Sequence, residues 1–177
     1  VRQAILQLVN DGYLRREKSK GTFVTTPPTK FRFIEGLRGF SAEMKRHGIA
    51  YVSKVLEKDV IAADEKVAQR LAIPDGELVF YMHRLRVVNN WPFLLDRHYV
   101  PYKLVPGIET KLADNVSLYS ILEHDYKLVL HHGWREFEPV SPSSKKEMEL
   151  LEIYPTTHLL YVESVVYDTN NAPVDYF

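Results

Sequence analysis

LVFYMHRLRVVNNWPFLLDRHYV, residues 78–100, predicts a β-hairpin in the middle of the chain. Residues 78–88 and 92–100 are rich in aromatic and β-branched side chains, which favour strands. The intervening Asn89-Asn90-Trp91 is typical of a turn, because Asn tolerates the left-handed backbone that tight turns require. Two neighbouring antiparallel strands are therefore expected here.

Helices and strands alternate on both sides of this hairpin. Polar or glycine residues that can cap a helix flank four predicted helices, at 41–47, 63–71, 117–125 and 143–151. Further strands are predicted over 51–61, 133–140 and 159–167, and a last one begins at Pro173. Hairpins with interspersed helices predict an α+β fold built on a mainly antiparallel sheet.

The first 24 residues have a different pattern. An amphipathic helix is predicted over 1–10, and the stretch 13–25 holds a basic tip between two short apolar runs. A helix followed by a basic two-stranded ribbon is typical of the second half of a winged helix-turn-helix domain, whose recognition helix lies in the major groove. The expected DNA contacts are made by base-reading, phosphate-binding and wing-tip residues, namely Arg2, Gln3, Arg15, Arg16, Lys18, Lys20, Gly21 and Thr22. A surface helix with a basic hairpin of no special purpose is the alternative.

Charge is distributed unevenly along the chain. The 177 residues contain 23 basic and 23 acidic side chains and no cysteine. Residues 1–30 hold six basic and two acidic residues, so this end is basic and the remainder mildly acidic. Such a distribution suits a protein in which one end meets phosphate. The absence of cysteine excludes disulfides and thiolate metal sites and fits a cytoplasmic protein, and no apolar run is long enough to predict a membrane span.

Three charged residues of the central hairpin are predicted to converge. Arg84 and Arg86 lie two apart on one strand, so both side chains leave the same face of the sheet. Neighbouring guanidinium groups repel unless an anion or carboxylate lies between them. In an antiparallel pair, the numbers of two opposite residues add up to a constant sum. Asp96 lies on the same face as Arg84 and Arg86 only if that sum is even, as it is for 84 and 96. A two-residue turn at Asn89-Asn90 gives an odd sum. Pro92 favours a longer loop or a bulge, which restores the even sum. The alternative is a surface ladder of ion pairs.

One predicted helix start is a further candidate for ligand contacts. Free N–H groups at a helix start favour an anion, and Gly39-Phe40-Ser41 precedes one predicted helix. The plainer interpretation of Ser41 is an N-cap. Ser117 and Tyr119 begin another helix, where the alternatives are a cap for Ser117 and a core position for Tyr119.

The N-terminal motif resembles the GntR family of bacterial transcription regulators. The resemblance rests on Val1-Arg2-Gln3-Ala4-Ile5, Asp11-Gly12-Tyr13-Leu14 and Lys20-Gly21-Thr22-Phe23-Val24. The family often has Gly where Ser19 stands. Because the chain opens within a predicted helix, we expect the first two helices of that domain to precede Val1.

Downstream, the order of motifs resembles the UTRA effector-binding domain of the HutC branch of that family. The motifs are Gly39–Gly48, Arg84-Leu85-Arg86, Leu95–Pro101, Ser117-Leu118-Tyr119, Leu159–Ser164 and Pro173–Tyr176. The resemblance implies a chorismate-lyase-like fold, a small-molecule effector and a homodimer. It also implies effector contacts by Ser117, Tyr119, Asp96 and Asp175, the last two at positions where the family often has Glu.

Metal, cofactor and enzyme functions find little support in the sequence. The seven histidines lack the usual ligand spacing, and the adjacent His131 and His132 are expected to point to opposite faces of a strand. No phosphate-binding loop or nucleophile-elbow motif occurs, so no metal or cofactor is predicted. A chorismate-lyase-like enzyme acting on a small carboxylate, a sensor of a carboxylate catabolite, and a partner-binding module with a vestigial pocket remain as alternatives.

The preferred interpretation is a bacterial regulator, more often a repressor in this family, with three segments. Residues 1–26 belong to a winged helix that binds operator DNA, 27–30 form a linker, and 31–177 form the UTRA domain, whose last strand is expected to continue beyond Phe177. The predicted effector is a small anion such as a sugar phosphate. Its predicted contacts are Gly39, Phe40, Ser41, Arg84, Arg86, Asp96, Ser117, Tyr119 and Asp175.

Overall fold

The computed structural model describes residues 2–10, 14–17, 21–24 and 39–177. The chain divides into two compact units, 1–35 and 36–177. The linker predicted at 27–30 lies outside the described residues.

The N-terminal unit contains a short helix and a two-stranded ribbon, as predicted. Helix α1 spans Arg2–Asn10, and the antiparallel strands β1 (Leu14–Glu17) and β2 (Gly21–Val24) pair from Leu14 opposite Val24 to Glu17 opposite Gly21. The side chains of Leu6, Leu8, Phe23 and Val24 are exposed, so the described elements of this unit do not bury them.

The C-terminal unit is built on one antiparallel sheet of six strands. Their order across the sheet is β3-β4-β5-β8-β7-β6, so the central hairpin β4–β5 is joined to the second hairpin β6–β7 through the short β8. The strands are β3 (Tyr51–Ala62), β4 (Leu78–Val88), β5 (Trp91–Pro101), β6 (Leu130–Val140), β7 (Leu159–Asp168) and β8 (Pro173–Tyr176). The predicted α+β architecture is confirmed.

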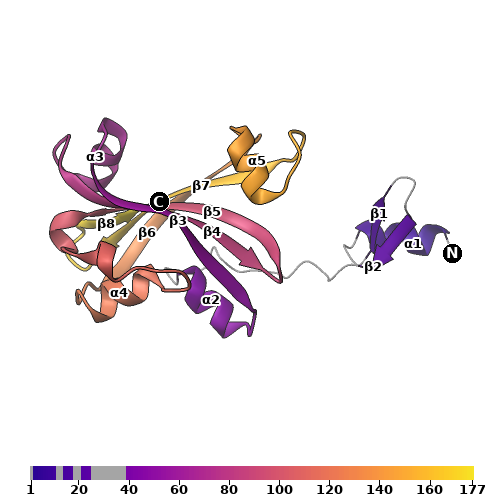
Figure 1. Ribbon diagram of the computed structural model, residues 1–177, viewed down its shortest axis with the longest axis horizontal. Coiled ribbons are helices and arrows are strands. Elements are labelled where there is room, and N and C mark those ends of the chain that lie inside the picture. The colour runs from indigo at the N-terminus through magenta and orange to yellow at the C-terminus, as the bar shows by residue number, and fades with distance from the viewer. Residues whose placement is uncertain (1, 11–13, 18–20, 25–38) are drawn as a thin grey trace. The chain divides into compact units, whose positions relative to one another are not determined.

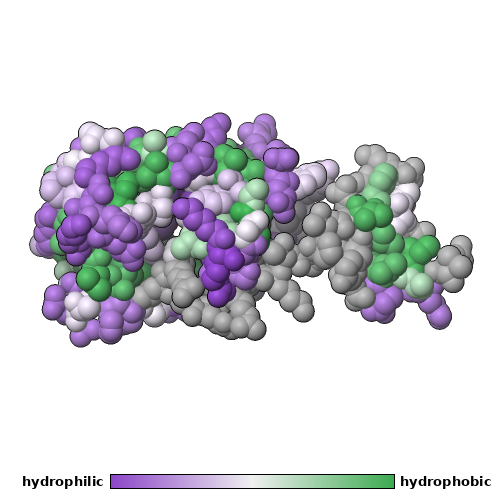
Figure 2. Space-filling model, turned by 90° about the horizontal axis from the view of Figure 1, so that it is seen from below, coloured by the Kyte–Doolittle hydropathy of each residue, from purple (hydrophilic) through white to green (hydrophobic). Residues whose placement is uncertain are grey.

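Helices cover both faces of this sheet. Figure 1 shows α2 (Phe40–Arg46) and α4 (Leu118–His124) on one side, and α3 (Glu65–Leu71) and α5 (Lys145–Leu151) on the other. Two short 3₁₀ helices, η1 (Tyr102–Leu104) and η2 (Ile108–Thr110), connect β5 to α4. The outer surface on the α2 and α4 side is mostly hydrophilic, with scattered apolar patches (Figure 2). No helix in the described part of the chain is long and apolar enough to cross a membrane.

Two apolar clusters hold the helices against the sheet. On the α4 side, Phe80 and Met82 of β4 pack with Leu118 and Leu122 of α4 and are almost fully buried. On the α3 side, alternate residues of the same strands point the other way, and Val79 packs with α3 through residues such as Leu71. The alternation of side chains along each strand therefore gives the sheet two buried faces, as strands covered on both sides require.

Side-chain caps fix the start of three of the helices. Asp64 accepts a hydrogen bond from the backbone N–H of Val67 in α3, Ser117 from that of Ser120 in α4, and Ser144 from that of Glu147 in α5. The cap by Ser117 is the one predicted from the sequence, and such caps satisfy N–H groups that have no partner within the helix.

The register of the central hairpin is set by its turn and by one bulge. Asn89 and Asn90 have φ angles of 51° and 66°, so the loop is a two-residue turn that places Val88 opposite Trp91. Kept throughout, that register would place Asp96 opposite His83, on the wrong face of the sheet. The register shifts by one residue beyond Val87, and Arg84 then pairs with Asp96. The bulge that the sequence suggested therefore forms, and it turns Asp96 toward the arginines.

Candidate functional site

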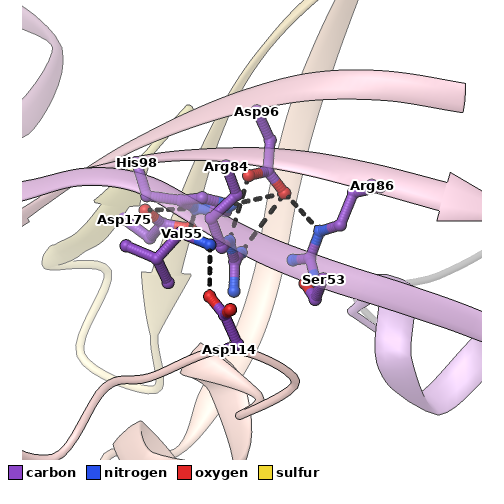
Figure 3. A network of polar contacts seen from close by, with 8 residues as sticks. All are labelled: Ser53, Val55, Arg84, Arg86, Asp96, His98, Asp114 and Asp175. Carbon is purple, nitrogen blue, oxygen red and sulfur yellow. Dashed lines mark hydrogen bonds and ion pairs between the residues drawn. The ribbon is translucent and has the colours of Figure 1, made fainter. Parts of the chain in front are cut away.

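Arg84, Arg86 and Asp96 form the centre of a buried polar network on the α2 and α4 side of the sheet (Figure 3). Asp96 accepts hydrogen bonds from Nε and Nη2 of Arg84 at 3.0 and 3.2 Å, and from Nε of Arg86 at 2.9 Å. Both arginines are almost fully buried, with 2 % and 3 % of their surface exposed. The predicted convergence is therefore present, and burial excludes the alternative of a surface ladder.

Electrostatics keep the carboxyl group of Asp96 ionised. Burial acts to raise its pKa, but contact with His98 and the charges of Arg84 and Arg86 hold that pKa well below its usual range. The carboxylate thus supplies the negative charge that two adjacent guanidinium groups need.

The two arginines differ in how many of their N–H groups have a hydrogen-bond partner. Arg86 also donates from Nη1 to the hydroxyl of Ser53 on β3, and its guanidinium lies 4.8 Å from the centre of the Phe40 ring. Burial lowers the pKa of Arg86, and Asp96 opposes that shift. Within the described residues, by contrast, Nη1 of Arg84 is buried and has no hydrogen-bond partner. Arg84 therefore holds a buried N–H donor that has no acceptor among the described residues.

His98, which was not among the predicted site residues, also belongs to this network. Its Nδ1 lies 2.9 Å from a carboxylate oxygen of Asp175 on β8, and its Nε2 lies 3.5 Å from Asp96. The ring of Phe177 packs beside it, with centroids 5.2 Å apart. The rule that placed Arg84 and Arg86 on one face also applies to Asp96 and His98, which lie two apart on β5. That pattern was the available signal.

Tyr119 and Asp175 are brought together, as their shared assignment to the site requires. The Tyr119 hydroxyl donates to Asp175 at 2.9 Å, and Asp175 is fully buried. Burial and the neighbouring carboxylate raise the pKa of Tyr119 well above its usual value, so the phenol stays protonated. Tyr119 also packs against the apolar cluster around α4. It therefore combines a position at the edge of the core with a polar contact in the network.

The loop before α4 is tied to β3 beside the network. The backbone N–H of Ser53 donates to Asn115 at 2.8 Å, and that of Val55 donates to Asp114 at 2.7 Å (Figure 3). These bonds hold the start of α4, and Ser117 with it, against the strand that supplies Ser53. Ser117 itself caps α4, so the capping alternative is present at this position.

The start of α2 differs from the sequence prediction. Ser41 was interpreted as the N-cap, but Gly39 occupies that position, no side chain caps the helix, and Ser41 lies buried in the first turn. The Gly39 carbonyl accepts from the N–H groups of Ala42 and Glu43. Helix α2 starts one residue earlier than predicted, because Phe40 packs on Arg86 and on Tyr51, with ring centroids 5.4 Å apart in the latter pair.

Gly39 lies against the Tyr119 ring, and this contact explains why a glycine stands there. A Cβ at position 39 would lie 3.1 Å from Cδ2 of Tyr119. We expect Gly39→Ala to lower the free energy of unfolding by roughly 1–3 kcal/mol, the usual cost of overpacking, as measured by urea denaturation. Unchanged stability would show that the ring moves aside freely.

The residues predicted to contact DNA are only partly described. Arg2 and Gln3 lie in α1, Arg15 and Arg16 in β1, and Gly21 and Thr22 in β2. Lys18 and Lys20 lie outside the described residues. The helix-and-ribbon frame is thus present, and the DNA contacts themselves stay a prediction.

One expectation about the histidines is wrong. His131 and His132 were expected to point to opposite faces, but the register of β6 shifts between Leu130 and His132, and the two Nδ1 atoms lie 3.2 Å apart. A bulge breaks the alternation of side chains, which is why the simple rule fails here. In the described part of the chain, no group of three or more residues with metal-binding side chains comes together.

Comparison with known proteins identifies the family. Residues 46–177 match the model of the UTRA domain. The chain is 32 % identical over 174 residues to YurK of Bacillus subtilis, an uncharacterized HTH-type transcriptional regulator, covering 98 % of this chain and 71 % of YurK. The chain belongs to the UTRA family of GntR-type transcription regulators.

Two further comparisons support this assignment. MngR of Escherichia coli, the mannosyl-D-glycerate transport/metabolism system repressor, is 28 % identical over 160 residues, covering 90 % of this chain and 65 % of MngR. The crystal structure of PhnF from Mycobacterium smegmatis superposes with a TM-score of 0.80 at 22 % identity, covering 99 % of this chain and 76 % of that one, and shows the same fold. The protein is thus a DNA-binding regulator, and its UTRA domain is the part that binds a small-molecule effector.

Proposed function

We propose that the arginine network of the UTRA domain binds the anionic group of the effector. The observation that carries this proposal is the buried, unpartnered Nη1 of Arg84. A buried N–H donor on a cation is costly to leave without an acceptor, so an anion placed there gains a charge-assisted hydrogen bond. Phe40, Ser117 and Tyr119 lie on the same side of the sheet, where they contact the non-ionic part of the effector.

The proposed effector is a sugar phosphate or a sugar linked to a carboxylic acid. Tyr119 and Asp175 already bond to each other, and Asp96 already accepts three hydrogen bonds, so in this proposal the arginines recognise the anionic group and not the sugar hydroxyls. The carboxylate of Asp96 lies between the two guanidiniums, which supports the proposal that these arginines bind a planar anion. The name of MngR, which includes mannosyl-D-glycerate, favours the carboxylate as the second candidate.

In the proposed mechanism the effector changes the affinity for operator DNA. The intact regulator acts in the cytoplasm as a homodimer and a repressor, consistent with relatives named repressors. The α1 helix and the β1–β2 ribbon contact DNA, and the effector favours one arrangement of the two DNA-reading heads. The effector can change operator affinity by no more than the ratio of its own affinities for the two arrangements. We propose no catalytic step, because the relatives are regulators.

A thermal-shift screen of the full chain tests the anion site. The panel pairs each sugar phosphate and sugar acid with the uncharged sugar of the same skeleton. We expect the midpoint to rise with at least one anionic member and to stay unchanged with its neutral counterpart, because a ligand that binds the folded state stabilises it. An equal rise of the midpoint with the neutral sugar would contradict a role of the arginine network in recognition.

A further inference from the structure

The contacts of His98 determine its protonation state. Both of its ring nitrogens face a carboxylate, at 2.9 Å for Nδ1 to Asp175 and 3.5 Å for Nε2 to Asp96. Asp175 is an acceptor in this arrangement, because the hydroxyl of Tyr119 also donates to it. A neutral imidazole carries a proton on only one nitrogen, so it would direct a lone pair at one carboxylate. The geometry is satisfied by the doubly protonated imidazolium.

Counting the buried charges shows what this proton does. Arg84 and Arg86 are cations, and Asp96 and Asp175 are carboxylates, so these four groups balance one another. The imidazolium of His98 adds one positive charge to a network that is otherwise neutral. An anion that enters beside Arg84 therefore meets an attractive field because of His98, and the interaction is strong because the groups are removed from water.

We propose that His98 is a specificity-determining residue of the effector site, whose imidazolium makes the network cationic and so selects an anionic effector. This inference rests on the proposed function, since it concerns the charge of the same site. His98 touches Asp96 and Asp175 and acts on the ligand through the charge of the network, so it is a positioning residue. It also links effector binding to pH.

The direction of the pH effect follows from the groups around His98. Burial acts to lower its pKa, but Asp175 of β8 and Asp96 of β5 raise it above its ordinary value of 6.5. The charged or titratable groups that act on this network also include Arg84 and Arg86 of β4, Tyr119 of α4, and Arg135 of β6, whose charge acts on Tyr119. Because the folded-state pKa is raised, the imidazolium is present below it and is lost as pH rises through it. Anion affinity therefore falls with rising pH.

Nitrogen NMR of the full chain tests the protonation state directly. With ¹⁵N-labelled histidine, the resonances of His98 are assigned by their absence in His98→Gln. We expect both ring nitrogens to show imidazolium shifts at pH 7. A neutral tautomer of His98 at pH 7 would overturn the proposal without affecting the role of Arg84.

Sulfate titration tests the consequence for binding. Sulfate is the probe because its charge is constant between pH 6 and pH 9.5, whereas phosphate titrates in that range. At pH 6 we expect His98→Gln to bind sulfate roughly tenfold more weakly than the unmodified protein. The affinity of the unmodified protein should weaken in step with the NMR titration of His98, while that of His98→Gln stays flat. The amide of Gln keeps a polar group at this position but carries no charge.

His83→Gln is the matched control. His83 is also a buried histidine of the central hairpin, but it lies on the opposite face, and burial lowers its pKa. We expect this variant to keep the sulfate affinity and pH profile of the unmodified protein. Equal sulfate binding by His98→Gln and the unmodified protein would show a merely structural role for His98. Absence of sulfate binding by the unmodified protein would instead contradict the anion site of the proposed function.

Discussion

Asp96→Ala is expected to lower the free energy of unfolding of the UTRA domain by about 3–5 kcal/mol, the usual cost of removing one partner of a buried ion pair. The carboxylate accepts three hydrogen bonds from Arg84 and Arg86 and faces His98. Without it, three buried cations are left with Asp175 as the one carboxylate of the network. Urea denaturation followed by tryptophan fluorescence measures the loss.

Asp75→Ala is the control for this variant. Asp75 lies in an exposed turn before β4, and we expect its replacement to change stability by less than about 0.5 kcal/mol. A loss in Asp96→Ala no larger than in this control would mean that Asp96 does not neutralise the arginines in solution.

Acid denaturation gives a second measure of the same carboxylate. The pKa of Asp96 is lowered in the folded state, so its contribution is fully present above the unfolded value of about 3.9 and is lost as pH falls below it. The stability difference between the unmodified protein and Asp96→Ala should therefore shrink as the pH is lowered from 5 to 2. A constant difference over this range would contradict the lowered pKa.

The sequence was sufficient to predict the elements that carry the site. The aromatic and β-branched residues of 78–88 and 92–100 predicted β4 and β5, and the spacing of Arg84 and Arg86 predicted their shared face. Asp96 could join them only through an odd-numbered loop or a bulge, and the bulge beyond Val87 is what forms. Local rules worked here because the alternation of a strand is a strong geometric constraint.

The same local rules could not predict contacts between segments that are distant in the sequence. His98 meets Asp175 because β8 pairs with β5, through Tyr99 opposite Tyr176, and no local pattern specifies that pairing. Helix α2 begins at Phe40 rather than at Ser41 because Phe40 packs on Arg86, which lies 46 positions later in the chain. The bulge at His131 likewise depends on how β6 meets β7. In each case tertiary packing overrides the local preference.

Arg84→Ala is expected to weaken binding of the anionic effector by about 2–5 kcal/mol, or roughly 30- to 4,000-fold. The variant removes the one buried donor of the network that has no partner among the described residues, together with one charge. The measurement is calorimetric titration with the sugar phosphate or sugar acid found in the thermal-shift screen. Operator binding without effector should be unchanged, because Arg84 lies in the UTRA domain and not in the helix-and-ribbon unit.

Arg97→Ala is the matched control, since Arg97 is an exposed arginine next to Asp96 that points to the opposite face of the sheet. It should bind the effector like the unmodified protein. Normal effector binding by Arg84→Ala would contradict the assignment of the site, and equal loss in both variants would indicate a general effect of net charge.

Charge balance explains why Arg84→Ala is a better variant than Asp96→Ala for measuring the loss of effector binding. Without Arg84, the network retains Arg86 and His98 as cations opposite Asp96 and Asp175, so two positive charges still face two negative ones. Without Asp96, the cations outnumber the carboxylates by two. Arg84→Ala should therefore destabilise the domain less than Asp96→Ala, although it removes the larger side chain. If that order holds, loss of effector binding in a folded Arg84→Ala protein reports on recognition rather than on folding.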